Sequence, residues 1–467
     1  MCKRWKIWLL VTCQMVGPCV VGAQEEETIQ VRRLTLSPMA EAREALKHRL
    51  LPRTYELKDT NAALQYQSAA AWCPEKGEDD IYDKLDTWRD MPLEDLPRDE
   101  ILNVLGQFSA SFRSVELATS RRRCEWDMPM EEGFSMLLPS LSKYRKIVFA
   151  LAVKTRLQVA DGQFHEALAT ITHGLAMGRG IAEGPTLIQD LVGVSISAVM
   201  LKNTAELMAS PDAPNLYWAL SELPDPLVDF RQSMGYEYDL MYWEIPELLD
   251  MEDKILSEAQ ASSIVENTFK KFSDAGLAGH KFLNLLPMAW VMLHYADAKV
   301  FLAERGVAVS RIEAMPAAQA VMMYQFQEFK EIRDRMFKWL VLPYPQYRVH
   351  ADQYDKAMGE ISQRGLKTNL FTIFLPALSR CRFMGARLCR DVDLLRVIEA
   401  LRLHAAANQG AFPKTLDDVT LVPIPMDPVT GGAFVYVYTD SQHVRIEAPE
   451  AKEQIKERPA FELTLRP

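Results

Sequence analysis

The chain has 467 residues, of which 48% are hydrophobic and 9% aromatic, and its formal net charge at pH 7 is −10. This length is too great for one small core and predicts about two to three domains, while the apolar content argues against wholesale disorder. The acidic balance argues against nucleic acid as a partner, because the one conspicuous basic block is Arg121-Arg122-Arg123.

The first 23 residues have the organisation of a secretory signal peptide. Lys3, Arg4 and Lys6 form a basic start, residues 7–21 are mainly apolar, and Val21-Gly22-Ala23 fits a small-residue cleavage site. We therefore expect an exported protein of the periplasm or the cell surface. Whether the segment is cleaved or kept as an anchor stays open, although its apolar run is short against the ~20 residues of a spanning helix. After cleavage no membrane span is expected.

Composition and periodicity divide the chain into four segments. Residues 1–23 are the expected signal peptide, 24–140 an N-terminal helical region, 141–390 a central helical array, and 391–467 a small α+β module. The expected fold class is therefore mainly α: an irregular array of antiparallel helices with a hairpin at its centre and a small C-terminal α+β module.

In the N-terminal region, the polar residues 24–38 are expected to be mobile. Four helices should follow, because apolar periodicity and turn-rich breaks alternate there. The expected ranges are residues 39–51, 60–72, 80–89 and 98–121.

Two helices of the central array should meet at the turn Ala160-Asp161-Gly162-Gln163, where Gly162 supplies a left-handed residue. The segment from Gly162 to Leu168 resembles the turn of a tetratricopeptide repeat, but no second copy follows at a period of 34 residues. Gly178 and Gly180 are expected to break the second helix. A further helix is expected at residues 186–210.

Several motifs together resemble a family of large exported proteins from planctomycete bacteria. They are Cys124-Glu125-Trp126, the segment 162–168, Glu183-Gly184-Pro185-Thr186, the segment 214–220 and Asp427-Pro428-Val429-Thr430-Gly431. The resemblance covers most of the chain after residue 23. It implies a bacterial source and an exported protein, and it assigns no catalytic residue.

The C-terminal segment changes character. A helix is expected at residues 392–408, followed by strands at 434–438, 443–447 and 461–465. This series, with its Asn-x-Gly-x-Phe-Pro turn, resembles the soluble part of type II secretion pseudopilins. The long N-terminal membrane helix of a pilin does not precede it, which puts pilus assembly in doubt and favours a borrowed or convergent module.

Four cysteines follow the expected signal peptide. Cys73 and Cys124 both lie at the ends of expected helices, and export permits disulfides, so a bridge between them is predicted, with buried thiols as the alternative. Cys381 and Cys389 lie about 12 Å apart along one expected helix and cannot pair there.

Two candidate sites consist of carboxylates. In the tail, Asp417, Asp418 and Asp427, with Asp440, are candidate calcium ligands, since Ca²⁺ prefers several oxygen ligands and some pseudopilins bind calcium near this loop. Their alternative is a role in turns and caps. In the segment 236–247, Glu237 and Glu244 stand among aromatic residues. Paired acids with stacking rings are the layout of glycoside hydrolysis.

No specific nucleophile, phosphate-loop or zinc motif is present in the sequence. The sequence therefore predicts a noncatalytic exported scaffold or interaction protein that binds a protein partner of unknown identity. The alternative is a secreted hydrolase that acts on polysaccharide through the acid-aromatic segment 236–247. No cofactor is expected, with calcium as the weak exception.

Overall fold

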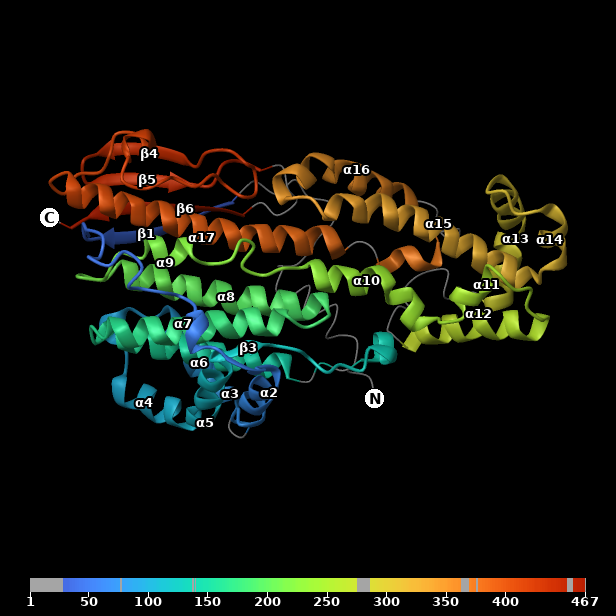
Figure 1. Cartoon of the computed structure of the whole chain (residues 1–467), viewed down its shortest axis with the longest axis horizontal. Helices are drawn as coiled ribbons and strands as arrows, with labels where there is room; N and C mark the ends of the chain where they lie inside the picture. The colour runs from blue at the N-terminus through green and yellow to red at the C-terminus, as the bar shows by residue number, and fades with distance from the viewer. Residues whose placement is uncertain are drawn as a thin grey trace. The chain divides into compact units, whose positions relative to one another are not determined.

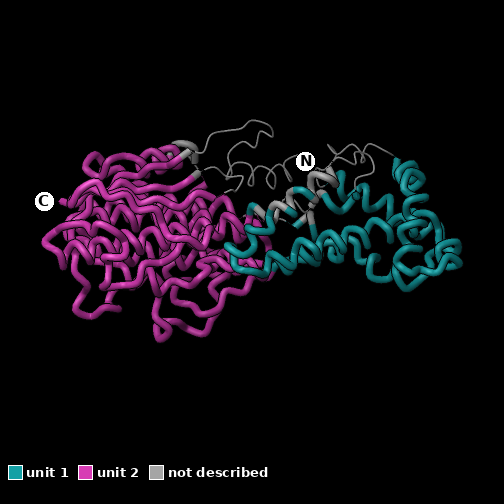
Figure 2. The backbone as a smooth tube through the Cα atoms, turned by 90° about the horizontal axis from the view of Figure 1, so that it is seen from above, with its two compact units in different colours: residues 1–23, 128–137, 234–380 teal, residues 24–127, 138–233, 381–467 magenta. Residues whose placement is uncertain are grey.

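The computed structural model describes residues 28–75, 78–136, 138, 140–274, 286–362, 369–374, 377–451 and 457–466. The expected signal peptide lies outside the described residues. The chain forms two compact units, which are coloured separately in Figure 2. Unit 1 takes its described residues from 128–137 and 234–380, and unit 2 from 24–127, 138–233 and 381–467.

Unit 2 contains the expected helical centre of the chain. Helices α6 (Leu141–Ala160), α7 (Phe164–Ala182) and α8 (Leu187–Met208) pack against one another, as Figure 1 shows. The turn between α6 and α7 is the predicted one, because Gly162 has a φ of 71°. Among the described helices α8 alone is long and apolar enough to cross a membrane, and 72% of its apolar window is buried in the protein.

The expected break at Gly178 and Gly180 is wrong, because α7 continues to Ala182. These glycines instead permit close packing. A Cβ on Gly178 would lie 2.5 Å from Ser197 Oγ of α8, and a Cβ on Gly193 of α8 would lie 2.5 Å from the Gly178 carbonyl oxygen. The glycines therefore let the two helix backbones approach more closely than any larger residue would allow.

Shorter helices surround this centre, and two N-terminal expectations need correction. Residues 39–51 contain no helix, and the expected helix 98–121 is two helices that meet at Phe108. The remaining helices of unit 2 are α2 (Ala63–Ala71), α3 (Glu78–Asp90), α4 (Arg98–Gln107), α5 (Ser109–Thr119), α9 (Tyr217–Ser221) and most of α17 (Ala377–Ala407).

A four-stranded sheet in the order β1-β6-β5-β4 completes unit 2. Its strands are β1 (Thr28–Leu36), β4 (Val435–Asp440), β5 (His443–Glu447) and β6 (Glu457–Leu465). The three C-terminal strands were expected, but β1 falls in the segment expected to be mobile. That expectation is wrong because β1 pairs in parallel along its whole length with β6, from Thr28 beside Glu457 to Leu36 beside Leu465.

The fold class is confirmed as mainly α with a small C-terminal α+β module. The predicted boundary between residues 390 and 391 lies inside α17, which runs without a break from Ala377 to Ala407.

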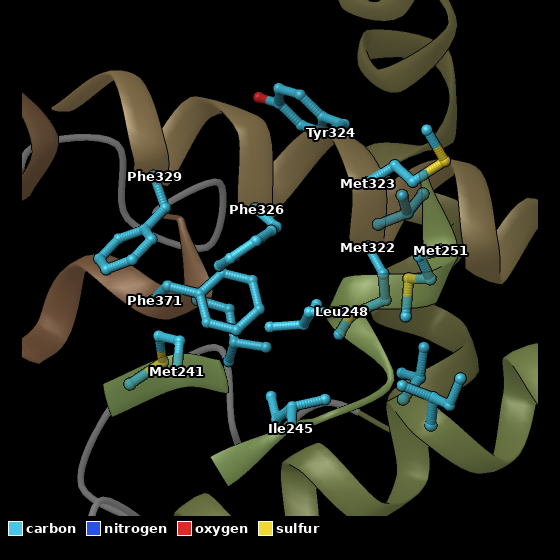
Figure 3. Close-up of a cluster of buried hydrophobic side chains, with 14 of the residues drawn as sticks. Met241, Ile245, Leu248, Met251, Met322, Met323, Tyr324, Phe326, Phe329 and Phe371 are labelled. Atoms are coloured by element: carbon cyan, nitrogen blue, oxygen red, sulfur yellow. The ribbon is translucent and has the colours of Figure 1, made fainter. Parts of the chain in front are cut away.

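Unit 1 is helical throughout its described part and has its own apolar core. Figure 3 shows Met241, Leu248, Met322, Phe326 and Phe371 in this core. Its helices are the greater part of α10 (Arg231–Glu244), α11 (Leu248–Met251), α12 (Glu258–Phe272), α13 (Pro287–Glu304), α14 (Val309–Ala314), α15 (Ala317–Leu340) and α16 (Tyr344–Ser362).

One buried ion pair ties three segments of unit 2 together. Glu399 and Arg402 lie one turn apart on α17, their side chains are 0% exposed, and Arg402 Nη1 lies 3.0 Å from Glu399 Oε1. Arg402 also donates to the carbonyl oxygens of Ser37, at 3.0 Å, and Ala213, at 2.7 Å. Asn215 Nδ2 donates to Glu399 Oε2 at 2.6 Å. Both charges are thereby compensated without water.

Replacement of Arg402 by leucine should strongly destabilise unit 2, because it leaves the Glu399 carboxylate buried without its cation. Removal of one partner of a buried pair costs roughly 3–5 kcal/mol. The double variant Glu399→Leu/Arg402→Leu should recover part of this loss. Urea unfolding followed by circular dichroism would measure both, and a double variant no more stable than Arg402→Leu alone would contradict this account.

Candidate functional sites: an arginine-lined cleft and an apolar helix face

The acid-aromatic segment does not form the cleft that glycoside hydrolysis would need. Glu237 and Glu244 both lie on α10, about 10 Å apart along its axis. Two of the aromatic rings between them, those of Tyr238 and Tyr242, pack against other rings of the protein, whereas Trp243 is 44% exposed. Tyr238 lies edge-on to Phe337 at a centroid distance of 5.2 Å, and Tyr242 lies edge-on to Phe326 at 5.3 Å. These rings are core contacts rather than a stacking platform for a sugar.

The two glutamates also have different surroundings. Glu244 is buried, and its Oε1 lies 3.5 Å from Lys271 Nζ. It lines a small pocket of about 230 Å³ with Glu247, Lys270 and Lys271, but neither Glu237 nor any aromatic residue lines that pocket. The predicted pair of catalytic acids is therefore not brought together.

Burial raises the pKa of Glu237 to about 7. The side chain is partly buried on α10, in the described part of unit 1. Its carboxyl group is therefore partly protonated near neutral pH, unlike an ordinary surface glutamate. The raised pKa belongs to Glu237 alone, because Glu244 lines a pocket that Glu237 does not line.

The candidate calcium ligands are committed to protein donors. Asp427 is buried and forms a two-pronged ion pair with Arg390, in which Nε lies 2.7 Å from Oδ1 and Nη2 lies 2.9 Å from Oδ2. Its Oδ2 also accepts hydrogen bonds from the backbone and the hydroxyl of Thr430. Burial would raise the pKa of Asp427, but the donors of Arg390 and Thr430 hold it below its usual value.

Two other acids of this set, Asp417 and Asp418, lie in a separate turn, and Asp440 accepts from the backbone of Gln442 and His443. Asp418 accepts from the backbone of Thr415 at 2.8 Å, and Asp417 is exposed beside it. Among the described residues no group of three acidic, histidine or cysteine side chains is placed to share a metal ion. Asp418 and Asp427 accept hydrogen bonds within turns, which is the role named as their alternative, and calcium binding stays a prediction.

The predicted disulfide between Cys73 and Cys124 is not formed. Cys73 Sγ lies 3.5 Å from the Tyr82 hydroxyl, whereas the Cys124 thiol donates to the Gly180 carbonyl oxygen at 3.1 Å. Burial raises the pKa of Cys124 to about 12, so this thiol stays protonated at neutral pH. Export permits a disulfide, but each sulfur contacts a different part of unit 2.

The motif Cys124-Glu125-Trp126 has a structural role at the end of α7. The last carbonyl groups of a helix lack intrahelical donors, and Gly180 is one of them. Its oxygen accepts from Trp126 Nε1 at 2.8 Å as well as from Cys124. A Cβ on Gly180 would lie 2.4 Å from the Tyr66 ring, so this position also needs glycine for packing.

These contacts form one wall of a cleft of about 700 Å³ in unit 2. The cleft is lined by residues from four stretches of the chain: 49–66, 118–126, 176–183 and 219–232. Five arginines line it, against three glutamates, an excess of two positive charges in a protein whose net charge is −10. The arginines are Arg49, Arg121, Arg122, Arg123 and Arg179.

The arginine triplet is held in place by a short parallel sheet. Strand β3 (Arg121–Arg123) pairs with β2 (Lys58–Asn61). Beyond the strands, Asn61 Nδ2 donates to the Glu125 carbonyl oxygen at 2.8 Å, and Glu125 N donates back to Asn61 Oδ1 at 3.0 Å. The backbone of the arginine triplet is therefore held by its pairing with β2 and by the hydrogen bonds between Asn61 and Glu125.

A second surface feature lies in unit 1, on helix α13. One face of this helix is buried through Trp290, Val291, His294, Ala298 and Leu302. The opposite face is exposed and apolar. It consists of Ala289, Met292, Leu293, Ala296, Val300 and Ala303, among which Met292 is 80% and Val300 61% exposed.

Comparison with protein-family models, curated proteins and solved structures found no match. Function is therefore inferred from the side chains of these two surfaces. The sequence showed the arginine triplet as a block, but not that Arg49 and Arg179 lie beside it.

Replacement of Glu237 by glutamine should stabilise the protein at alkaline pH. In the unfolded chain the Glu237 carboxyl group loses its proton near pH 4.5, and in the folded protein it does so near pH 7. The free energy of unfolding therefore falls as the pH rises between these two values. Glu237→Gln should therefore match the wild type near pH 4.5 and exceed it at pH 8 by roughly 1–3 kcal/mol. Urea unfolding at both pH values measures the difference.

The matched control for this experiment is Glu247→Gln, because Glu247 is exposed and lies near the end of the same helix. It should leave the pH dependence of unfolding unchanged. An equal gain from Glu237→Gln at both pH values would show that burial does not shift the pKa of this carboxyl group.

Proposed function

We propose that the protein is an exported, noncatalytic helical scaffold that acts by binding a protein partner through the exposed face of α13. The observation that carries this proposal is the continuity of that face. At 100° per residue, its six residues lie within about 60° of one line along the helix. No charged residue falls within this stripe. Large exposed apolar stripes of this kind mark interaction surfaces.

The spacing of the stripe indicates what kind of element it binds. Ala289, Leu293, Ala296, Val300 and Ala303 alternate at intervals of four and three residues, the spacing of a helix-packing seam. The alanines, seven residues apart, leave room for close approach, and Leu293 and Val300 between them supply apolar contact. The element that fits is an amphipathic helix of the partner, laid along α13.

An apolar helix face is stabilised in water when another element covers it. Helix α13 packs one face against the core of unit 1 and presents the other to solvent. The partner helix would remove this second face from water. At about 25 cal/mol per Å² of apolar surface, such burial is a substantial driving force for association.

Two sequence features support the exported location that the proposal includes. One is the basic and apolar start of the chain, and the other is the resemblance to exported planctomycete proteins. The pseudopilin-like C-terminal module fits a role in assembly with other exported proteins. No polysaccharide hydrolase is proposed, since Glu237 and Glu244 do not share a cleft.

Charged substitutions on this face should abolish partner binding and leave the fold intact. In Met292→Lys/Val300→Lys both altered side chains are exposed, so the unfolding midpoint should stay close to that of the wild type. The tagged full chain would be purified from the exported fraction of the source organism after cross-linking. Wild-type protein should recover a partner that the double variant loses or binds at least roughly tenfold more weakly.

The matched control is Leu102→Lys, because Leu102 is 58% exposed on α4 of unit 2 and lies outside the α13 face. This variant should recover the same partner as the wild type. Size-exclusion chromatography of the pure protein would show whether a second copy occupies the face instead. Identical recovery by wild type and α13 variant would contradict the proposal.

A further inference from the structure

We propose that the arginine-lined cleft of unit 2 binds a small anionic ligand, either a phosphate monoester or a dicarboxylate. This inference goes beyond the scaffold role, because it concerns a different unit and a ligand rather than a protein partner. It rests on the charge balance of the cleft, on buried donors without acceptors, and on the rigidity of the walls.

The charge of the ligand follows from the ion pairs in the cleft. Arg49 Nη2 lies 2.5 Å from Glu222 Oε1, and Arg123 Nε lies 3.0 Å from Asp59 Oδ1, so these two guanidinium groups have protein counterions. Arg121, Arg122 and Arg179 form no ion pair with the described residues. The lining contains three glutamates: Glu125, Glu183 and Glu222. Asp59 lies outside the lining but pairs with Arg123, so five arginines face four carboxylates and the cleft keeps a net positive charge, which attracts an anion.

One nitrogen atom, Nε, of each of two cleft arginines also lacks a hydrogen-bond acceptor. The Nε atoms of Arg49 and Arg121 are shielded from solvent and have no partner among the described residues. A buried donor without an acceptor costs about 1–3 kcal/mol. An anion in the cleft would instead give the guanidinium groups of Arg121, Arg122 and Arg179 the counterion that they lack among the described residues. Phosphate and carboxylate groups both match the geometry of arginine.

The walls of the cleft are fixed before any ligand binds. Strand β3 is paired with β2, and the residues after it are bound to the end of α7 through Gly180. Arg179 precedes Gly180 on the same helix turn and so is fixed relative to Arg121. A preformed set of donors lowers the entropic cost of binding, which favours recognition of a small anion.

The size of the cleft selects a small molecule rather than a macromolecule. A volume of about 700 Å³ lies within the range of small-molecule sites, which is roughly 300–1,000 Å³. The five arginines line one concavity, whereas nucleic acid requires an extended basic surface. Tyr66 and Trp126, which also line the cleft, are stacked with an interplanar angle of 12° and offer an apolar wall for the body of the ligand.

Isothermal titration of the full-length protein tests this inference with four probes at constant ionic strength. Inorganic phosphate and glycerol 3-phosphate represent the phosphate source, succinate represents the dicarboxylate source, and chloride is the control. We expect saturable binding of one dianion class at one site per chain. Binding by the phosphate probes alone identifies a phosphate site, and binding by succinate alone identifies a dicarboxylate site.

The variants Arg121→Ala and Arg179→Met should weaken binding roughly tenfold to a hundredfold, since each removes a charge-assisted contact. The matched control is Arg113→Ala, because Arg113 is exposed on α5 and does not line the cleft. It should leave the affinity unchanged. If Arg121→Ala fails to fold, the titration of the wild type and of Arg179→Met still decides the question.

Absence of binding by all three dianions would overturn the inference, as would equal weakening by Arg113→Ala. Neither result bears on the scaffold role, because the α13 variants leave the cleft unaltered. Conversely, Met292→Lys/Val300→Lys should bind the dianion as the wild type does. Loss of partner binding together with retained dianion binding would separate the two functions.

Discussion

Unit 2 depends on the buried pair of Glu399 and Arg402. The pair lies on α17, yet its hydrogen bonds reach Ser37, which follows β1, and the segment 213–215, which precedes α9. Neither charge is exposed, so every donor and acceptor must be met by protein. This requirement fixes the position of α17 relative to both segments. The end of β1 and the segment before α9 are both joined to α17 at this one turn.

Local signals predicted most of the helices, because apolar periodicity and turns are properties of short stretches. The hairpin at Gly162 and the strand 443–447 lie where they were expected. Strand β1 was missed because its partner β6 is more than 400 residues away in sequence, as the Arg33–Glu462 ion pair shows with a separation of 429. The helix break expected at Gly178 and Gly180 was wrong for a related reason. These glycines allow close contact with other elements, and no local sequence pattern shows such contacts.

The candidate sites show the same limit. Arg121-Arg122-Arg123 was visible as a block and was used only to judge nucleic-acid binding. The cleft needs Arg49 and Arg179 as well, which come from stretches separated by more than 50 residues on either side. Glu237 and Glu244 show the opposite error. They were predicted to act as a pair because they are close in sequence, yet only Glu244 lines the small pocket of unit 1. Sequence supplies the chemistry of such residues, and the packing of helices decides which of them meet.

The parallel pairing of β1 with β6 has a consequence for how the protein forms. Unit 2 is assembled from three stretches of sequence, and residues 234–380 of unit 1 lie between the second and the third. Its sheet cannot close until residues 457–465 are available to β1. Contacts this distant in sequence form slowly and leave apolar edges uncovered in the meantime. During synthesis, unit 1 can therefore complete its core before β1 pairs with β6, the last strand of the chain.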